Sequence, residues 1–86
     1  MTQSIDITVR YFASIREAMG TGSASIRTTA ATVGELRAEL MRQSPAAAAA
    51  LAEGRAVRMA LNQDMCEAGA ALGSGDEVAF FPPVTG

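Results

Sequence analysis

The sequence predicts an α+β domain in which one main helix and short helical turns pack on a mixed sheet of four to five strands. Alternating apolar and polar residues near both ends of the chain indicate strands, and a capped helical pattern lies between them. The chain has 86 residues, of which 49% are hydrophobic and 19% are charged, as is typical of one globular domain. A domain of this size has little room for an internal cavity that could hold an active site.

The N-terminal part predicts two paired strands joined by a short helical segment. Residues 4–12 alternate with a period of two, and Phe12 falls on the mostly polar face. The apolar side chains of the other face are those of Ile5, Ile7, Val9 and Tyr11. Residues 13–19 contain helix formers and end at Gly20, which predicts one or two helical turns. Residues 23–29 then predict a second strand that pairs with the first.

The middle of the chain predicts the main helix. Thr32 and Glu35 match a capping box, in which hydroxyl and carboxylate satisfy free backbone N–H groups of the first turn. Apolar side chains then recur at helical spacing at Val33, Leu36, Leu40 and Met41. Residues 44–53, with Ser as the cap and Pro at the first position, predict a short second helix that stops at Gly54.

The C-terminal part predicts three further strands. Residues 56–61 alternate, and the polar residues 62–64 supply a turn. Residues 65–68 predict a short edge strand. Residues 77–81 predict a last strand, which the two following prolines end because neither can donate a hydrogen bond to a ladder. If the first and last strands are parallel neighbours, the long middle connection is their crossover.

Two aromatic residues fall on the polar side of the predicted sheet. Phe12 has the parity of the polar residues of the first strand, and Phe81 is on the outer side of the last strand because Val78 and Phe80 face the core. If these strands are neighbours, Phe12 and Phe81 form an exposed apolar patch that Met65 extends. The alternative is that the strand ends curl and bury both rings locally.

The composition argues against catalysis by side chains of this chain. Without His there is no imidazole for proton transfer or metal binding, and without Lys there is no Schiff base. The single cysteine, Cys66, has no activating neighbour and is interpreted as a small apolar residue. One cysteine excludes an internal disulfide, which suits the cytosol. We therefore predict no bound cofactor and no metal site.

Charge and hydropathy also limit the classes of partner that the chain is expected to bind. The net charge is −2 and the seven arginines are scattered along the sequence, which disfavours nucleic-acid binding. The longest apolar run, residues 46–52, is far shorter than the roughly 20 residues that cross a bilayer, and the N-terminus is not a signal peptide. We expect no nucleic acid and no membrane as partner, and a cytoplasmic protein. The glycine pairs at 20–22 and 73–75 lack the spacing of phosphate loops and predict turns.

The C-terminal block, residues 75–86 (GDEVAFFPPVTG), resembles the end of the small, sulfur-carrying subunits of molybdopterin synthase, a ubiquitin-like β-grasp family. The resemblance extends over nearly the whole chain. The other matching segments are Tyr11-Phe12-Ala13, Ile15-Arg16-Glu17, Thr32-Val33, Leu36-Arg37 and Leu61-Asn62-Gln63. The resemblance implies a β-grasp domain over residues 1–81 and an extended C-terminal tail over residues 82–86.

The resemblance further implies a sulfur carrier that is not an enzyme by itself. A ubiquitin-activating-enzyme-like adenylyltransferase would use ATP to adenylate the C-terminal glycine, Gly86 in this sequence, and the product would become a thiocarboxylate. The tail would then enter the large catalytic subunit, in a heterotetramer of two plus two subunits, and donate sulfur to cyclic pyranopterin monophosphate. The residues implied in partner binding are Phe12, Met65, Phe81, Pro82, Pro83, Val84 and Thr85.

The last position departs from the family, which ends in Gly-Gly. Here the last two residues are Thr85 and Gly86, so Gly86 matches the penultimate glycine and we expect one further glycine beyond it. A protein ending at Gly86 would place its carboxylate up to about 3.5 Å short of the partner's chemistry. Two alternatives stay open: a carrier for thiamine or tRNA thiolation, against which residues 80–83 (FFPP) argue, and a binding module that is never thiolated.

Overall fold

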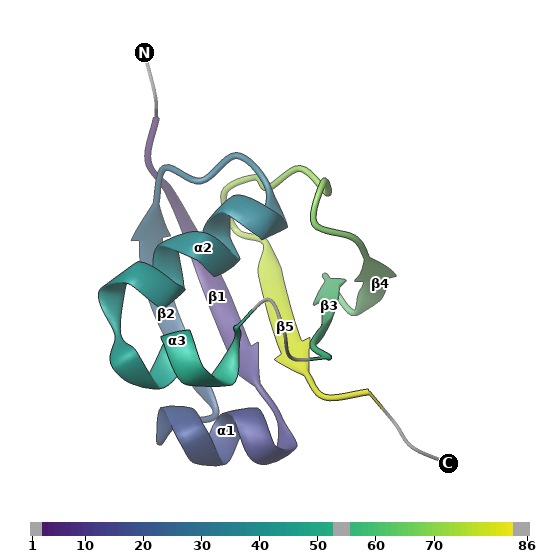
Figure 1. Ribbon diagram of the computed structural model, residues 1–86. Helices are drawn as coiled ribbons and strands as arrows, with labels where there is room; N and C mark the ends of the chain where they lie inside the picture. Colours follow the sequence, from purple (N-terminus) through teal and green to yellow (C-terminus); the bar gives the residue numbers. More distant parts are fainter. Residues whose placement is uncertain (1–2, 53–55, 84–86) are drawn as a thin grey trace.

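A computed structural model describes residues 3–52 and 56–83 of the chain (Figure 1). The elements follow the predicted order along the sequence. They are β1 (Ile5–Tyr11), α1 (Ala13–Met19), β2 (Ser23–Thr28), α2 (Val33–Gln43), α3 (Pro45–Ala50), β3 (Arg58–Leu61), β4 (Asp64–Cys66) and β5 (Glu77–Phe81). The predicted α+β class is confirmed.

The five strands form one mixed sheet in the order β2-β1-β5-β3-β4. Strands β1 and β5 come from opposite ends of the chain and lie side by side and parallel, with Val9 opposite Val78 and Tyr11 opposite Phe80. The other neighbours, β1 with β2, β3 with β5 and β3 with β4, are antiparallel. The adjacency of the first and last strands, on which the aromatic patch depends, is thereby confirmed.

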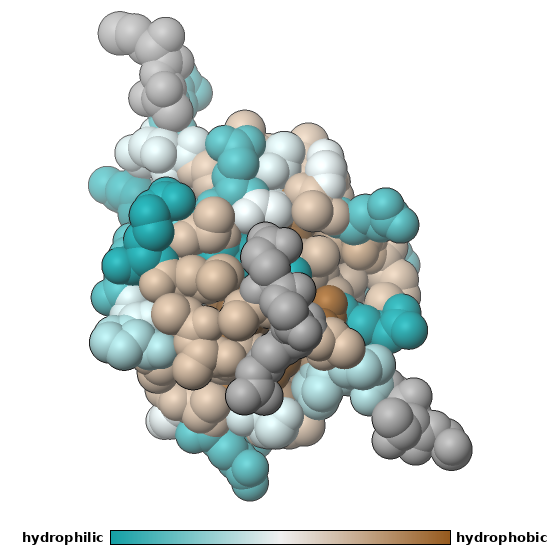
Figure 2. All heavy atoms as spheres, in the orientation of Figure 1, coloured by the Kyte–Doolittle hydropathy of each residue, from teal (hydrophilic) through white to brown (hydrophobic). Residues whose placement is uncertain are grey.

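The helices lie on one side of the sheet. Figure 1 shows α2 and α3 over this face and α1 beside α3 near the end of the strands. Figure 2 views the same side, where moderately apolar surface spreads over α3 and α1 and polar residues lie toward the edges. We call the opposite face of the sheet, which no described helix covers, the open face.

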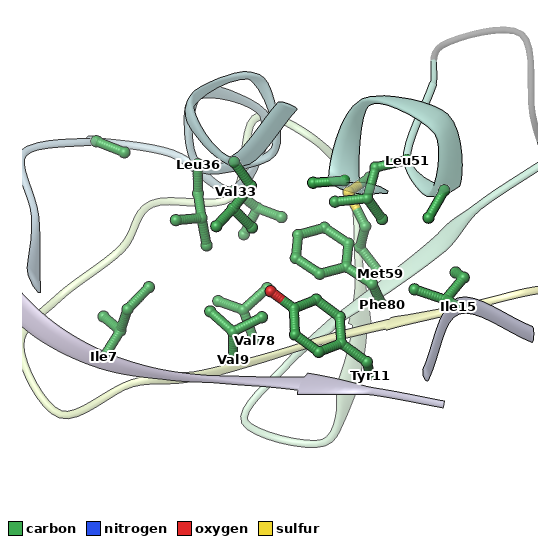
Figure 3. Packing of buried hydrophobic residues seen from close by; sticks show 14 residues of the cluster. Ile7, Val9, Tyr11, Ile15, Val33, Leu36, Leu51, Met59, Val78 and Phe80 are labelled. Atoms are coloured by element: carbon green, nitrogen blue, oxygen red, sulfur yellow. The ribbon is translucent and has the colours of Figure 1, made fainter. Parts of the chain in front are cut away.

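The core lies between the sheet and the helices, as Figure 3 shows. Its largest fully buried side chains are Phe80, Leu36, Leu51, Val9, Val33 and Val78. The rings of Tyr11 and Phe80 stack with centroids 6.3 Å apart and planes at 18°. The inward-facing residues predicted from the alternation of the first strand and from the helical spacing are therefore confirmed, because both periods bring their apolar side chains to one core.

The start of α2 uses the threonine half of the predicted capping box, while the Glu35 carboxylate binds the Thr32 hydroxyl instead of a backbone N–H. Thr32 Oγ1 accepts a hydrogen bond from the backbone N–H of Glu35 at 3.2 Å, and the hydroxyl also donates to Glu35 Oε2 at 3.3 Å. Directly after the cap, the N–H of Gly34 donates to Ala68 O at 2.8 Å. A Cβ at Gly34 would lie 2.9 Å from the Ala68 Cβ, so only glycine allows the first turn of α2 to approach this loop so closely.

The second short helix ends earlier than predicted, at Ala50 rather than in the segment before Gly54. The side chain of Arg37 explains this end, because its Nε donates to Leu51 O at 2.7 Å and its Nη2 donates to Ala52 O at 2.9 Å. These carbonyls are thus taken by a side chain instead of by a further helical turn. The predicted stop at Gly54 lies outside the described residues.

The last hairpin also differs from its prediction. Strand β4 covers Asp64–Cys66 rather than residues 65–68. The turn before it has only two residues, Asn62 and Gln63, and both have positive φ, 50° and 72°. Two successive residues with positive φ match the twist of paired strands, so the hairpin closes one residue earlier than a three-residue turn would allow.

Candidate functional site

Two aromatic side chains meet on the open face at the C-terminal end of β5. The parallel ladder of β1 and β5 continues beyond β1, where the N–H of Phe12 donates to Phe80 O at 3.2 Å. This register places Phe12 beside Phe81, with ring centroids 6.5 Å apart and planes at 86°, an edge-to-face contact. Phe12 remains 42% exposed and Phe81 is half-buried. The strand ends therefore do not bury both rings.

The two rings form one wall of an open apolar hollow at the base of the tail. Its lining residues are Phe12, Ala13, Phe81, Pro82 and Pro83, and its volume is about 500 Å³. We call this hollow the aromatic pocket. Because the pocket and the segment leading to the C-terminus share Pro82 and Pro83, a partner that fills the pocket also contacts the start of the tail.

Met65 lies on the open face but does not line the aromatic pocket. It is 59% exposed and stands opposite Ala60, which in turn stands opposite Ala79 of β5. These two alanines are only 6% and 8% exposed. Their small side chains lie between Met65 and Phe81. Met65 therefore extends the predicted patch across these alanines and not through direct contact with the aromatic rings.

The backbone at Ala13 has an unusual conformation. Its φ is 53°, in the left-handed region that a residue with a Cβ seldom adopts. At this point the chain passes from β1 directly into α1, while Phe12 stays extended and donates to the ladder. The cost of a left-handed alanine is about 1 kcal/mol. The sequence shows no signal for it, because alanine is the expected residue at the start of a helix.

Pro82 also contacts the helical side of the molecule. A second hollow of about 240 Å³ lies between the start of α1, the end of α3 and the start of β3, and Pro82 lines it together with Ile15, Ala50 and Val57. Pro82 therefore lines both this hollow and the aromatic pocket. Three of the predicted site residues, Val84, Thr85 and Gly86, lie outside the described residues.

Cys66 is not placed for chemistry. Burial raises the pKa of its thiol, so less thiolate is present near neutral pH than in a free cysteine. Within residues 3–52 and 56–83, His, Cys, Asp and Glu form no group of three or more that could hold a metal ion. In the same part of the chain, no helix has both the length and the apolarity needed to cross a membrane.

Strands from both ends of the chain lie side by side in a mixed sheet, the helices cover one face, and the last strand is followed by two prolines. These features define a β-grasp protein. Within this class the sequence relationship is specific. Residues 9–86 match the ThiS family, and the chain belongs to this family.

Two relatives share the name molybdopterin synthase sulfur carrier subunit. The protein from Escherichia coli K12 is 42% identical over 80 residues, which cover 93% of this chain and 98% of the relative. The protein from Haemophilus influenzae is 36% identical over the same lengths. Both relatives are therefore matched over nearly their full length.

Solved structures support the fold. SAMP1 from Haloferax volcanii superposes with a TM-score of 0.78 at 28% identity, covering 94% of this chain and 98% of that one. A chain in a protein–protein complex of subunits 1 and 2 of molybdopterin-converting factor from Helicobacter pylori gives a TM-score of 0.65 at 26% identity, covering 95% and 99%. The latter relative is thus seen with a second subunit.

Proposed function

We propose that this chain is the sulfur-carrier subunit of molybdopterin synthase. The observation that carries the proposal is the position of the aromatic pocket at the base of the tail, in a chain that matches carriers of this name over 93% of its length. A large subunit that docks on Phe12 and Phe81 receives the segment that follows Pro83. The complex of subunits 1 and 2 of molybdopterin-converting factor from Helicobacter pylori supports association with a second subunit.

The chemistry takes place at the C-terminal glycine. Its carboxylate is ionised near neutral pH and is a poor electrophile until a leaving group is attached. The adenylyltransferase joins the carboxylate to the α-phosphate of ATP and releases pyrophosphate. A sulfur donor then displaces AMP and leaves a thiocarboxylate, whose sulfur passes to cyclic pyranopterin monophosphate in the large subunit.

In this proposal the chain is a substrate of one enzyme and a reagent for another. It holds no cofactor, and ATP is used by the activating partner. The absence of His and Lys from the sequence supports a carrier that supplies no acid, base or nucleophilic side chain. The proposal places the chain in the cytoplasm, in an assembly of two carriers and two large subunits.

The tail has the physical properties that insertion requires. The two prolines restrict the backbone at its base, which reduces the conformational entropy lost when the partner binds. A terminal glycine has no side chain and passes through a narrow channel. We expect an interface made of the aromatic pocket, Met65 and an inserted tail to exceed the roughly 1,000 Å² typical of a specific complex.

Thiolation is tested by intact mass spectrometry. Two forms, one ending at Gly86 and one extended by a single glycine, are incubated with the cognate adenylyltransferase, ATP and a sulfur donor. We expect the extended form to exchange one oxygen for sulfur, and the reaction without ATP is the control. If neither form exchanges, the carrier proposal is wrong and the chain is a binding module that is not thiolated.

The choice of pathway is tested by adding the thiolated chain to the large subunit and cyclic pyranopterin monophosphate. We expect molybdopterin to form and the carrier to return to its carboxylate mass. Thiolation without this transfer, together with rescue of a thiamine-deficient or tRNA-thiolation-deficient strain, would assign the carrier to another pathway.

A further inference from the structure

Two arginines lie beside the Phe12–Phe81 pair on the open face. The guanidinium carbon of Arg10 lies 5.8 Å from the centroid of the Phe12 ring, within the range of a cation–π contact. Arg58 stands opposite Phe81 in the pairing of β3 with β5. Both arginines are exposed. Far apart in the sequence, they lie on the two sides of the Phe12–Phe81 pair because the sheet order brings β1, β5 and β3 together.

Neither arginine is neutralised within the described part of the chain. Within residues 3–52 and 56–83, taken together, the one ion pair joins Arg27 to Asp6 at 3.0 Å. Two carboxylates lie near the arginines on the open face. Glu77 lies two pairs along the β1–β5 ladder from Arg10, on the same face, and Glu67 lines a hollow together with Arg58. Neither of these carboxylates is within ion-pair distance of its arginine, so both guanidinium groups present donors to solvent.

The two charged side chains directly beside the Phe12–Phe81 pair are positive, opposite in sign to the net charge of the whole chain, which is −2. From this contrast we propose that Arg10 and Arg58 select a protein partner that surrounds an apolar protrusion with carboxylates. The inference rests on the proposed function and names the chemistry of the large-subunit surface that fills the aromatic pocket. Planar guanidinium groups bind carboxylates through two parallel hydrogen bonds, which gives geometric selectivity as well as attraction.

The same geometry argues against a second copy of this chain as the occupant. In a two-fold contact through the pocket, the arginines of both copies would lie around one apolar centre. Among the described residues, Glu67 and Glu77 are the carboxylates placed near these arginines, and arginines that face each other across an interface oppose association. A partner with a carboxylate rim avoids this repulsion.

Exposed charges at the rim of an interface mainly change the association rate and the choice of partner. Arg10 is partly ordered by its contact with Phe12, so pairing with a carboxylate costs less side-chain entropy than for a freely moving arginine. We therefore expect an effect that is strong at low ionic strength and weak at high ionic strength.

The test measures binding of the purified chain to its cognate large subunit by stopped-flow and calorimetry at about 0.05 M and about 0.5 M salt. The variants are Arg10→Glu, Arg58→Glu and both together. Arg42→Glu is the matched control, because Arg42 is exposed on α2 and the charge change is the same. Circular dichroism confirms that each variant is folded.

We expect the double variant to bind at least about tenfold more weakly at low salt, mainly through slower association, and the difference to fall below about threefold at high salt. Arg42→Glu should bind like the unaltered chain. Equal binding by the double variant at low salt, or an unaltered chain that dimerises through these arginines, overturns the inference. Failure of the unaltered chain to bind the large subunit at all overturns the proposed function instead.

Discussion

The helix-covered face and the open face of the sheet are built from alternate residues of the same strands, yet they carry different kinds of side chain. On the covered face, Val9, Val78 and Phe80 are fully buried beneath the helices. On the open face, Phe12 and Met65 remain exposed beside two arginines. The apolar residues of the covered face account for folding, whereas Phe12 and Met65 on the open face remain exposed in the isolated chain. Association with a partner explains their exposure.

Adjacent phenylalanines offer the sharpest comparison of the two faces. Phe80→Ala removes a fully buried ring and should lower the free energy of unfolding by about 3–5 kcal/mol. Phe81→Ala removes a half-buried ring that contacts Phe12, and we expect a loss of about 1 kcal/mol. Urea titration monitored by circular dichroism gives both values.

The binding of the same two variants completes the comparison. Phe81→Ala should still fold but should bind the large subunit more weakly, by about 1–3 kcal/mol, because the partner loses a wall of the aromatic pocket. Equal losses of stability at the two positions would show that the open face also belongs to the core.

A second test concerns the close approach of α2 to the loop at Ala68. Gly34→Ala raises the intrinsic helix propensity, but the new Cβ would lie 2.9 Å from the Ala68 Cβ and 3.1 Å from Ala68 O. Because the loop must shift, we expect a net loss of about 1–3 kcal/mol in the free energy of unfolding. Ala38→Gly, in the same helix, is a control for propensity alone, with a loss of about 1 kcal/mol. A gain in stability for Gly34→Ala would contradict the contact.

A third test concerns the strain at the aromatic pocket. Ala13→Gly should raise the free energy of unfolding by about 1 kcal/mol, since glycine adopts a φ of 53° without penalty. Ala18→Gly is the matched control in the same short helix and should lower it by a similar amount. Thermal unfolding distinguishes the two signs, and a loss of stability at both positions would refute the strain at Ala13.

The fold could be predicted because its main signals are local. Each of these signals depends on a few neighbouring residues. They are the alternation in residues 4–12 and 77–81, the helical spacing after Thr32 and the proline pair after Phe81. The end of α3 could not be predicted in this way. It depends on Arg37, which reaches the carbonyls of Leu51 and Ala52 from another helix.

The candidate site was predicted only in part for the same reason. The parity of Phe12 and Phe81 indicated the aromatic pair, since each parity is a property of one strand. The positions of Arg10 and Arg58 beside that pair follow from pairing between strands far apart in the chain. In sequence these arginines are scattered, and the structure is needed to show that they lie beside one pair of aromatic rings.

The smallest expected effect is a dependence of stability on alkaline pH that arises on the covered face. Burial raises the pKa of Tyr11 above its ordinary value of 10.0, so the folded chain holds this proton more tightly than the unfolded chain. The contribution of Tyr11 to stability is therefore complete below the pKa of the unfolded state and is lost as the pH rises through the folded pKa. Cys66 acts with the same sign, starting from an ordinary value of 9.0.

Tyr11→Phe removes the titrating hydroxyl and keeps the ring that stacks on Phe80. Urea unfolding between about pH 8 and pH 11 should show a smaller loss of stability for Tyr11→Phe than for the unaltered chain. Cys66→Ala should remove the earlier part of the loss, nearer pH 9. If the alkaline loss is identical in all three proteins, neither group is responsible, and the covered face does not hold these protons more tightly than the unfolded chain does.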